Sequence, residues 1–272
     1  MTTLRFGDVE LTRVLYLDAA IDPEPTGLTP AEVRAVPWGE PTWADGGQVR
    51  AAACAWVVRS GGRTIVVDPA GNVDDILHDP VTTLDHQRGF VDAFTRVGID
   101  PGTVDTVLLS HIESIGMAAV RDGDTWRPFF PNSRVLISDA ALAHFDDASR
   151  FPMLFEAYDA LITQGLVDTF ADGDEIVPGL RAQWTGAHNP GHTAFHVGTA
   201  TKSAATFVGH LAVTGVHLGT GPCVNQHFDP DKAWALLEEW RADGRVLVGP
   251  LWPSPGAGRW TGDALVPVST DE

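Results

Sequence analysis

The sequence predicts an α/β fold in which two β-sheets pack face to face and helices cover their outer sides. Short β-branched runs come first as hairpins, then alternate with helical segments, and this order is repeated in the second half. No repeat, low-complexity stretch or break in composition marks a linker. We therefore expect residues 1–272 to form a single domain.

The first half of the chain predicts two hairpins with one helix between them. The hairpins turn at Gly7-Asp8 and at Ser60-Gly61-Gly62, where adjacent glycines allow a tight turn. Within the looser, proline-rich stretch between the hairpins, Thr29, Pro30 and Glu32 form the capping box that begins a short helix. The predicted strands of this half are residues 4–6, 9–17, 50–59 and 63–68.

The second half predicts a buried strand followed by mixed elements. Residues 104–109 form a short apolar run, which is typical of a buried strand and ends in a polar loop. The remaining predicted helices are 86–97, 139–145, 151–164 and 231–241, and the remaining predicted strands are 134–138, several short strands within 166–209, and a final strand at 245–248. The chain after residue 248 is rich in proline and glycine, and we expect no strand there.

The net charge of −18 argues against two classes of partner. An acidic surface repels nucleic acid and anionic membranes, so neither is expected to bind. The first ten residues lack an apolar signal region, and no apolar run reaches membrane-spanning length. Cys54 and Cys223 are the only cysteines, too few for a disulfide framework. We expect a soluble, cytoplasmic protein.

The loop after the buried strand carries candidate chemistry. His111 and Glu113 stand two residues apart at a strand end, where they can point the same way and hold one ion or one substrate. The alternative is a histidine bonded to a backbone carbonyl, with a solvated glutamate beside it. Spacing alone does not choose between these interpretations.

Six short segments follow one another along the chain. They are residues 64–68 with Gly71-Asn72, residues 104–111, Pro131-Asn132-Ser133, Pro190-Gly191-His192-Thr193, Val208-Gly209-His210 and Pro253-Ser254-Pro255-Gly256. In this order they resemble the metallo-β-lactamase superfamily, most closely its lactonase and methyl parathion hydrolase-like branch. The resemblance extends over nearly the whole chain and implies a four-layer αββα sandwich of two mixed sheets.

The resemblance also implies the metal ligands. Aligned without gaps on the family pattern His-x-His-x-Asp-His, the positions that hold the first metal correspond to His111, Glu113, His192 and His210, and these residues would also be the catalytic ones. The positions that hold the second metal are Ile115, Gly116 and Leu251, and none of these can bind a metal. The chain therefore predicts one divalent metal, such as Zn, Fe or Mn, held by three imidazoles and a carboxylate.

Several alternatives stay open at this point. A gapped alignment places Glu113 and Ser114 on the Asp-His pair of the pattern, and His188 can replace His192 as the ligand. Otherwise we expect His188, His196, Ser114 and Asp68 to support the ligands by hydrogen bonds, or His188 and His196 to lie on a strand surface. His217 and His227 are expected to be loop residues. A site without any metal, in which histidines act as acid and base, also remains open.

These residues predict an enzyme that acts on a small, hydrophobic or aromatic molecule. The expected reaction is hydrolysis of an ester or lactone, or a related cyclase, lyase or isomerase step. The residues expected to form an apolar rim, or alternatively packing and core residues, are Trp38, Trp43, Phe151 and Trp252. A non-catalytic binding protein and oxygen chemistry at a single iron are the alternatives, and a homodimer is left open.

Overall fold

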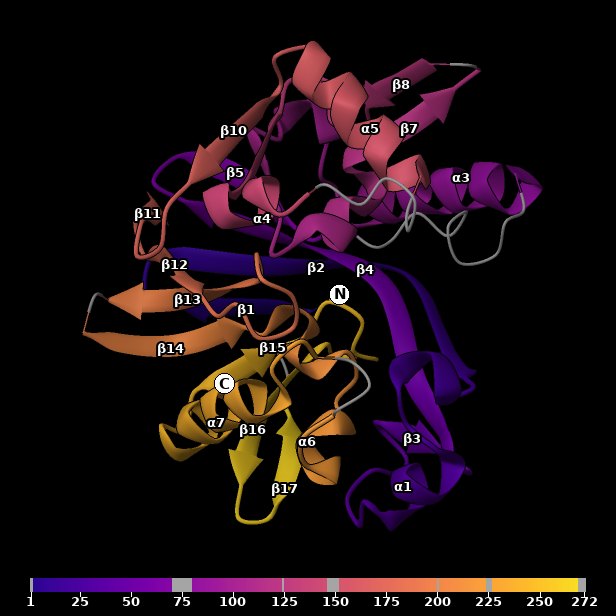
Figure 1. The fold of residues 1–272 in the computed structure, drawn as a ribbon, viewed down its shortest axis with the longest axis vertical. Coiled ribbons are helices and arrows are strands. Elements are labelled where there is room, and N and C mark those ends of the chain that lie inside the picture. Colours follow the sequence, from indigo (N-terminus) through magenta and orange to yellow (C-terminus); the bar gives the residue numbers. More distant parts are fainter. Residues whose placement is uncertain are drawn as a thin grey trace.

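Two large β-sheets lie face to face at the centre of the computed structural model (Figure 1). The structure describes residues 2–69, 80–123, 125–145, 152–199, 201–223 and 227–268. The first sheet has the strand order β1-β2-β4-β5-β6-β9-β10, with β3 paired to β4. Its strands are β1 (Thr3–Phe6), β2 (Val9–Ile21), β3 (Ala44–Asp45), β4 (Gln48–Ser60), β5 (Arg63–Val67), β6 (Thr106–Leu108), β9 (Arg134–Ser138) and β10 (Val167–Phe170).

The second sheet has the order β11-β12-β13-β14-β15-β16-β17. Its strands are β11 (Glu175–Val177), β12 (Leu180–Trp184), β13 (Thr193–Thr199), β14 (Lys202–Phe207), β15 (Val246–Val248), β16 (Ala257–Thr261) and β17 (Ala264–Pro267). Both sheets are mixed, because β5, β6, β9 and β10 pair in parallel, as do β14 and β15, while the other pairs are antiparallel. A separate hairpin joins β7 (Ala119–Asp122) to β8 (Thr125–Pro128).

Helices cover the outer sides of the two sheets, which confirms the predicted αββα arrangement (Figure 1). The α-helices are α1 (Pro30–Ala35), α3 (Pro80–Arg96), α4 (Asp139–Ala143), α5 (Pro152–Thr163), α6 (His217–Thr220) and α7 (Pro230–Ala242). The 3-10 helices are η1 (Glu24–Thr26), η2 (Pro101–Thr103), η3 (Ile112–Ala118) and η4 (Gly209–Ala212). Among the described residues, no helix combines the length and apolar content needed to cross a bilayer.

The buried residues form three layers of core. Trp56, Phe195 and Phe207 belong to the layer between the sheets. Phe90 of α3 belongs to the layer outside the first sheet, and Trp240 of α7 belongs to the layer outside the second. Strand β4 shows why its sequence is apolar at successive positions: alternate side chains face two different core layers, so both faces of the strand are buried.

Most predicted elements are present, with shifted ends and one error. The capping box at Thr29 and Glu32 begins α1 as predicted. Residues 245–248 are not the final strand, because β16 and β17 follow and turn at Gly262, which has a φ of +60°. The proline and glycine residues that argued against further strands lie mainly in the turns before and after β16.

The predicted aromatic rim is wrong for two of its four residues. Trp43 and Trp252 are buried, stack edge to face with ring centroids 5.4 Å apart, and belong to the core layer beneath α7. Their indole nitrogens donate to the carbonyls of Leu265 and Ala212 at 3.0 and 2.8 Å, so each polar atom is satisfied inside the core. Trp38 is half-buried against Trp260, and Phe151 lies outside the described residues.

Truncation of Trp252 tests this placement. We expect Trp252→Ala to lower the free energy of unfolding by about 3–5 kcal/mol, the range for a large buried aromatic side chain. Trp38→Ala is the control, because its ring is only partly buried, and we expect a loss of about half that size or less. Urea unfolding followed by tryptophan fluorescence and circular dichroism measures both. Equal and small losses would mean that Trp252 is not a core residue.

Candidate functional site

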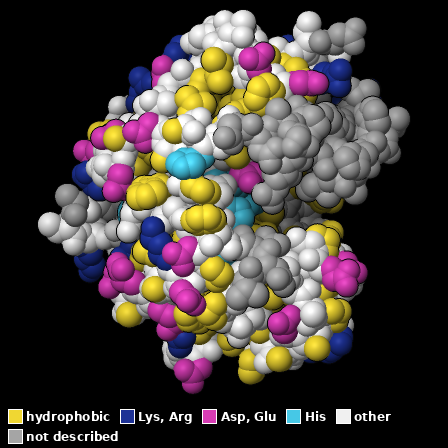
Figure 2. Space-filling view, viewed as in Figure 1, with side chains coloured by type: hydrophobic (Ala, Val, Ile, Leu, Met, Phe, Trp, Pro, Cys, Tyr) yellow, Lys and Arg dark blue, Asp and Glu magenta, His cyan; other side chains and the backbone are white. Residues whose placement is uncertain are grey.

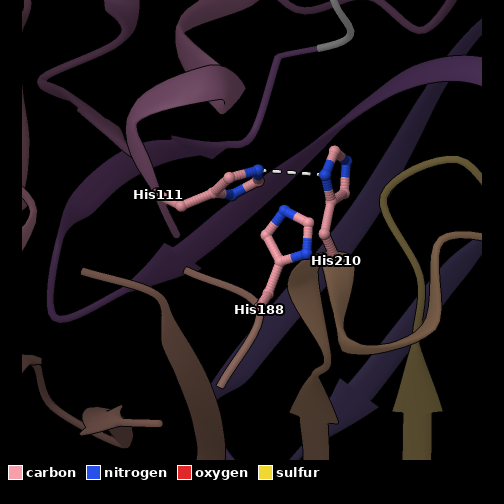
Figure 3. A group of neighbouring side chains, drawn as sticks. All are labelled: His111, His188 and His210. Carbon is pink, nitrogen blue, oxygen red and sulfur yellow. Dashed lines mark hydrogen bonds between the residues drawn. The ribbon is translucent and has the colours of Figure 1, made fainter. Parts of the chain in front are cut away.

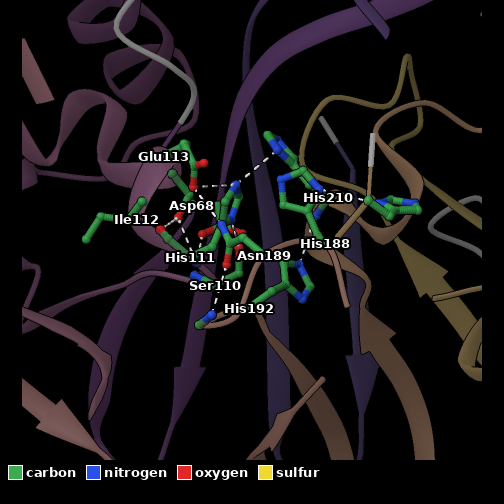
Figure 4. A network of polar contacts seen from close by, with 12 residues as sticks. Asp68, Ser110, His111, Ile112, Glu113, His188, Asn189, His192 and His210 are labelled. Atoms are coloured by element: carbon green, nitrogen blue, oxygen red, sulfur yellow. Dashed lines mark hydrogen bonds and ion pairs between the residues drawn. The ribbon is translucent and has the colours of Figure 1, made fainter. Parts of the chain in front are cut away.

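Five histidine side chains come together at one edge of the sandwich, from four separate segments. Figure 4 labels His111, His188, His192 and His210. His111 follows β6, and His188 and His192 lie in the loop between β12 and β13. His210 lies in η4 after β14, and His227 lies just before α7. The end of a strand of the first sheet therefore supplies one imidazole, loops that follow β12 and β14 of the second sheet supply three, and the segment before α7 supplies one.

Three of these rings present nitrogen atoms to one another (Figure 3). One ring nitrogen from each of His111, His188 and His210 lies within 4.8 Å of the other two, and His111 Nε2 is 3.0 Å from His210 Nδ1. Zn–N bonds of about 2.0–2.1 Å place two tetrahedral ligand nitrogens about 3.3 Å apart. The three imidazoles thus form a donor set that fits one metal ion.

His111 is oriented by a chain of hydrogen bonds that starts at Asp68. The Ser110 amide donates to Asp68 Oδ1 at 2.8 Å, and Ser110 Oγ lies 2.8 Å from His111 Nδ1. Ser114 Oγ donates to the His111 carbonyl at 2.7 Å. Because Nδ1 is engaged by Ser110, Nε2 faces His210 and His188. Asp68 and Ser114 therefore both hold the backbone that carries His111, Asp68 through the Ser110 amide and Ser114 through the His111 carbonyl.

Burial favours the neutral form of three imidazoles of this cluster. Desolvation lowers the pKa of His111, His192 and His210 well below the usual value of 6.5, and neighbouring imidazoles lower it further. Neutral rings keep a lone pair free for a metal or a hydrogen bond. Burial raises the pKa of Asp68 to about 6, against the hydrogen bonds from Ser110 and Ser114 that lower it.

Glu113 lies beside the three rings. Its Oε2 is 3.9 Å from His111 Nε2 and accepts a hydrogen bond from Asn189 Nδ2 at 2.8 Å. The Glu113 side chain is 26% exposed, whereas His111 is fully buried. The carboxylate is thus held next to the cluster and is also open to solvent.

His192 is placed differently from the other predicted ligands. Its Nε2 accepts the His210 backbone amide at 3.1 Å, and its Nδ1 lies 2.7 Å from Thr185 Oγ1. A Cβ on Gly209 would lie 2.3 Å from the same Nε2, so the ring is tightly packed against η4. Both ring nitrogens of His192 are therefore engaged, one by the backbone of η4 and one by the Thr185 hydroxyl. His188, and not His192, belongs to the group of three nitrogens that lie within 4.8 Å of one another.

The three positions that correspond to a second metal offer no ligand. Ile115 is buried in the core layer outside the first sheet, and Gly116 is buried with a φ of +41°. The Leu251 carbonyl accepts the amide of Ala52, which joins this loop to β4. These positions thus serve packing and backbone pairing.

Sequence reasoning missed three residues of the site. His227, expected to be a loop residue, has its Nδ1 3.4 Å from His188 Nδ1. Asn189 holds Glu113, and Thr185 holds His192. The position of His227 depends on backbone bonds from Phe228 and Asp229 to the segment that carries His188, and no local pattern indicates this pairing.

His196 does not support the cluster. It projects from β13 toward α7, where its ring contacts Trp240 with a centroid distance of 5.6 Å. Its two nitrogens lie 2.8 Å from Thr206 Oγ1 and 2.6 Å from Gln183 Oε1. Burial and the adjacent Arg245 lower the pKa of His196 to about 4. His196 is therefore a strand-surface residue beneath a helix, one of the two alternatives left open above.

The low pKa of His196 predicts a pH dependence of stability. The imidazole of His196 takes up a proton near pH 6.5 in the unfolded chain, but only near pH 4 in the folded chain. As the pH drops from 6.5 to 4, the protonation of His196 should therefore lower the free energy of unfolding by about 3 kcal/mol. Chemical denaturation of wild type and His196→Gln across this range measures it. A variant with the same pH slope as wild type would contradict this assignment.

Comparison with known proteins agrees with the fold. No family model and no curated protein matches the chain. Solved structures do match: the hydrolase AbOPH of the beta lactamase superfamily has 19% identity and a TM-score of 0.75, and the match covers 100% of this chain and 98% of that one. AidC, a dizinc quorum-quenching lactonase, has 17% identity and a TM-score of 0.74 over 98% and 97% of the two chains.

A third solved structure is an N-acyl homoserine lactone hydrolase with its product bound at the catalytic metal centre. It has 15% identity and a TM-score of 0.57 over 93% of this chain and 94% of that one. The chain has the metallo-β-lactamase fold. The resemblance indicated by the sequence segments is thus confirmed at the level of the fold, and the chemistry has to be argued from the site.

Proposed function

We propose that this metallo-β-lactamase-fold chain is a hydrolase that uses one divalent metal held by His111, His188 and His210. The observation that carries the proposal is the convergence of three imidazole nitrogens within 4.8 Å, where burial lowers the pKa of His111 and His210 well below its usual value. Three imidazoles are a known donor set of catalytic zinc, so zinc is the ion we propose. A bound zinc ion lowers the pKa of water and polarises a carbonyl oxygen.

The chain supplies its own proton acceptor in Glu113. This carboxylate lies 3.9 Å from His111 Nε2, is partly exposed, and is oriented by Asn189. A positioned carboxylate beside a reacting water acts as a general base. We therefore assign Glu113 to proton transfer, and Asp68, Ser110 and Ser114 to holding His111.

The proposed site differs from that of a dizinc lactonase such as AidC. Ile115, Gly116 and Leu251 carry no ligating side chain, so a second ion would lack its ligands. Activated esters and lactones suit a single-metal site, because the carbonyl carbon needs less activation than that of an amide. An ester or lactone is thus the proposed substrate class.

Metal analysis of variants tests the ligand set. We expect about one zinc ion per chain in wild type and less than about a tenth of that in His188→Ala, because one of only three ligands is lost. His144→Ala is the control, since His144 is exposed at the end of α4 and its ring nitrogen Nδ1 lies 2.8 Å from the Ala140 carbonyl oxygen, away from the cluster. Inductively coupled plasma mass spectrometry on protein purified without chelator gives the metal content.

Two further results of the same measurement separate the alternatives. Retention of zinc in His188→Ala with loss in His192→Ala would return the third ligand to His192. Wild type that neither contains metal nor gains stability when zinc is added would favour acid–base chemistry by the histidines alone.

Glu113→Ala should keep its zinc and lose about 10²–10⁴-fold in kcat on a lactone and p-nitrophenyl ester panel.

Two exposed aromatic side chains flank the segment that carries His188, and we propose that they bind the apolar part of the substrate. Phe228 is 74% exposed, and its amide donates to the His188 carbonyl at 3.0 Å. Trp184 is 45% exposed, and its indole donates to the Pro190 carbonyl at 2.7 Å. Figure 2 shows hydrophobic side chains beside the histidines at the centre of this face. These residues take the role that we first expected of Trp43 and Trp252.

The dependence of kcat/KM on the length of the acyl chain tests this contact. In wild type, kcat/KM for p-nitrophenyl esters should rise with each added methylene, by at most about 0.8 kcal/mol per group buried. Phe228→Ala should flatten this dependence and leave the acetyl ester almost unchanged. Phe155→Ala, which removes an exposed phenyl ring from α5, is the control and should keep the wild-type slope. A wild-type slope in Phe228→Ala would place the acyl chain elsewhere.

A further inference from the structure

Arg13 is a buried cation that has no charged partner within the described part of the chain. It lies on β2, is 2% exposed, and donates from Nη1 to Ser254 Oγ at 3.1 Å and from Nη2 to the Trp252 carbonyl. Its Nε is buried without a hydrogen-bond partner, and no described carboxylate forms an ion pair with it. A buried charge is costly unless an opposite charge compensates it.

A second guanidinium faces the same space. Arg13 and Arg96 line a surface cavity of about 280 Å³ at the edge of β2, beyond the point where β1 stops pairing. The Arg96 Nη2 donates to the Leu15 carbonyl at 3.2 Å. The other lining residues are apolar or carry a hydroxyl, and they are Thr2, Leu15, Ala93, Val97 and Ser254.

Among the residues that the structure describes, no carboxylate lines this cavity, although the chain carries a net charge of −18. Asp18 is close by, because its Oδ2 accepts the amide of Ser254 at 3.2 Å, but its other oxygen pairs with Arg50 at 2.9 Å. Asp18 is therefore engaged outside the cavity. Two arginines with two hydroxyls and no acid form a local positive site on an otherwise acidic protein.

We infer that this cavity binds a small oxyanion, a phosphate or carboxylate group, between Arg13 and Arg96. Guanidinium groups bind such oxygens through charge-assisted, often paired hydrogen bonds. Thr2 and Ser254 add hydroxyl groups at the wall. The volume corresponds to about nine water molecules at about 30 Å³ each, so a small anion fits with part of its hydration shell.

Titration with simple anions tests the inference. Sodium phosphate and sodium acetate are added separately, with sodium chloride at equal ionic strength as the reference, because salt alone screens the repulsion within an acidic protein. We expect a saturable rise in Tm above the chloride reference, and a Kd from isothermal titration calorimetry. A response to phosphate alone identifies a phosphate group, and a response to acetate alone identifies a carboxylate group.

Arg96→Gln is the decisive variant, because Arg96 is exposed and its replacement leaves the buried contacts of Arg13 in place. We expect its Kd to be at least about tenfold weaker, since a charge-assisted bond is lost. Arg59→Gln on β4 removes one positive charge outside the cavity and should bind like wild type. His188→Ala should also bind like wild type, which separates this cavity from the histidine cluster. Equal shifts with chloride, or wild-type affinity in Arg96→Gln, would overturn the inference.

Discussion

The site depends on one hydrogen bond between the ends of two parallel strands. β5 and β6 pair in parallel, so Asp68 and Ser110 leave the sheet at the same edge, and the Ser110 amide donates to the Asp68 carboxylate at 2.8 Å. This bond fixes the backbone that carries His111, and the Ser110 hydroxyl then engages the His111 ring. The imidazole of His111 is thus oriented by a buried carboxylate that accepts a hydrogen bond from the backbone amide before it.

The second sheet is joined to this strand end by backbone bonds and by close packing. The Thr193 amide donates to the Ser110 carbonyl at 2.8 Å, and Ser138 Oγ donates to the Gly191 carbonyl at 2.9 Å. A Cβ on Gly191 would lie 2.2 Å from the Cα of Ala141, so only glycine fits there. In this chain the Pro-Gly-His-Thr segment therefore connects two sheets, and His192 Nε2 accepts a hydrogen bond from the backbone of η4.

The sequence predicted the layers well because their signal is local. Strand runs, glycine turns and the capping box at Thr29 depend on neighbouring residues, and they appear where expected. The ring direction of His192 depends on its contact with the backbone of η4, between residues 18 positions apart. Trp43 and Trp252 looked like rim residues because they lie in irregular segments, yet these segments fold into the core beneath α7. Such errors concern tertiary contacts, which a sequence pattern does not contain.

Burial and charge explain why the site combines neutral imidazoles at its centre with two carboxylates beside them. The centre is built of neutral imidazoles, because burial in an apolar surrounding disfavours their protonation. The two carboxylates near these rings have different environments. Asp68 is buried and its pKa is raised, whereas Glu113 is partly exposed and accepts a hydrogen bond from Asn189. A dication among the three rings would favour the ionised form of both carboxylates and balance their charge. Three imidazoles and two carboxylates are thus sufficient for the proposed single ion, and no ligand is needed at the second-metal positions.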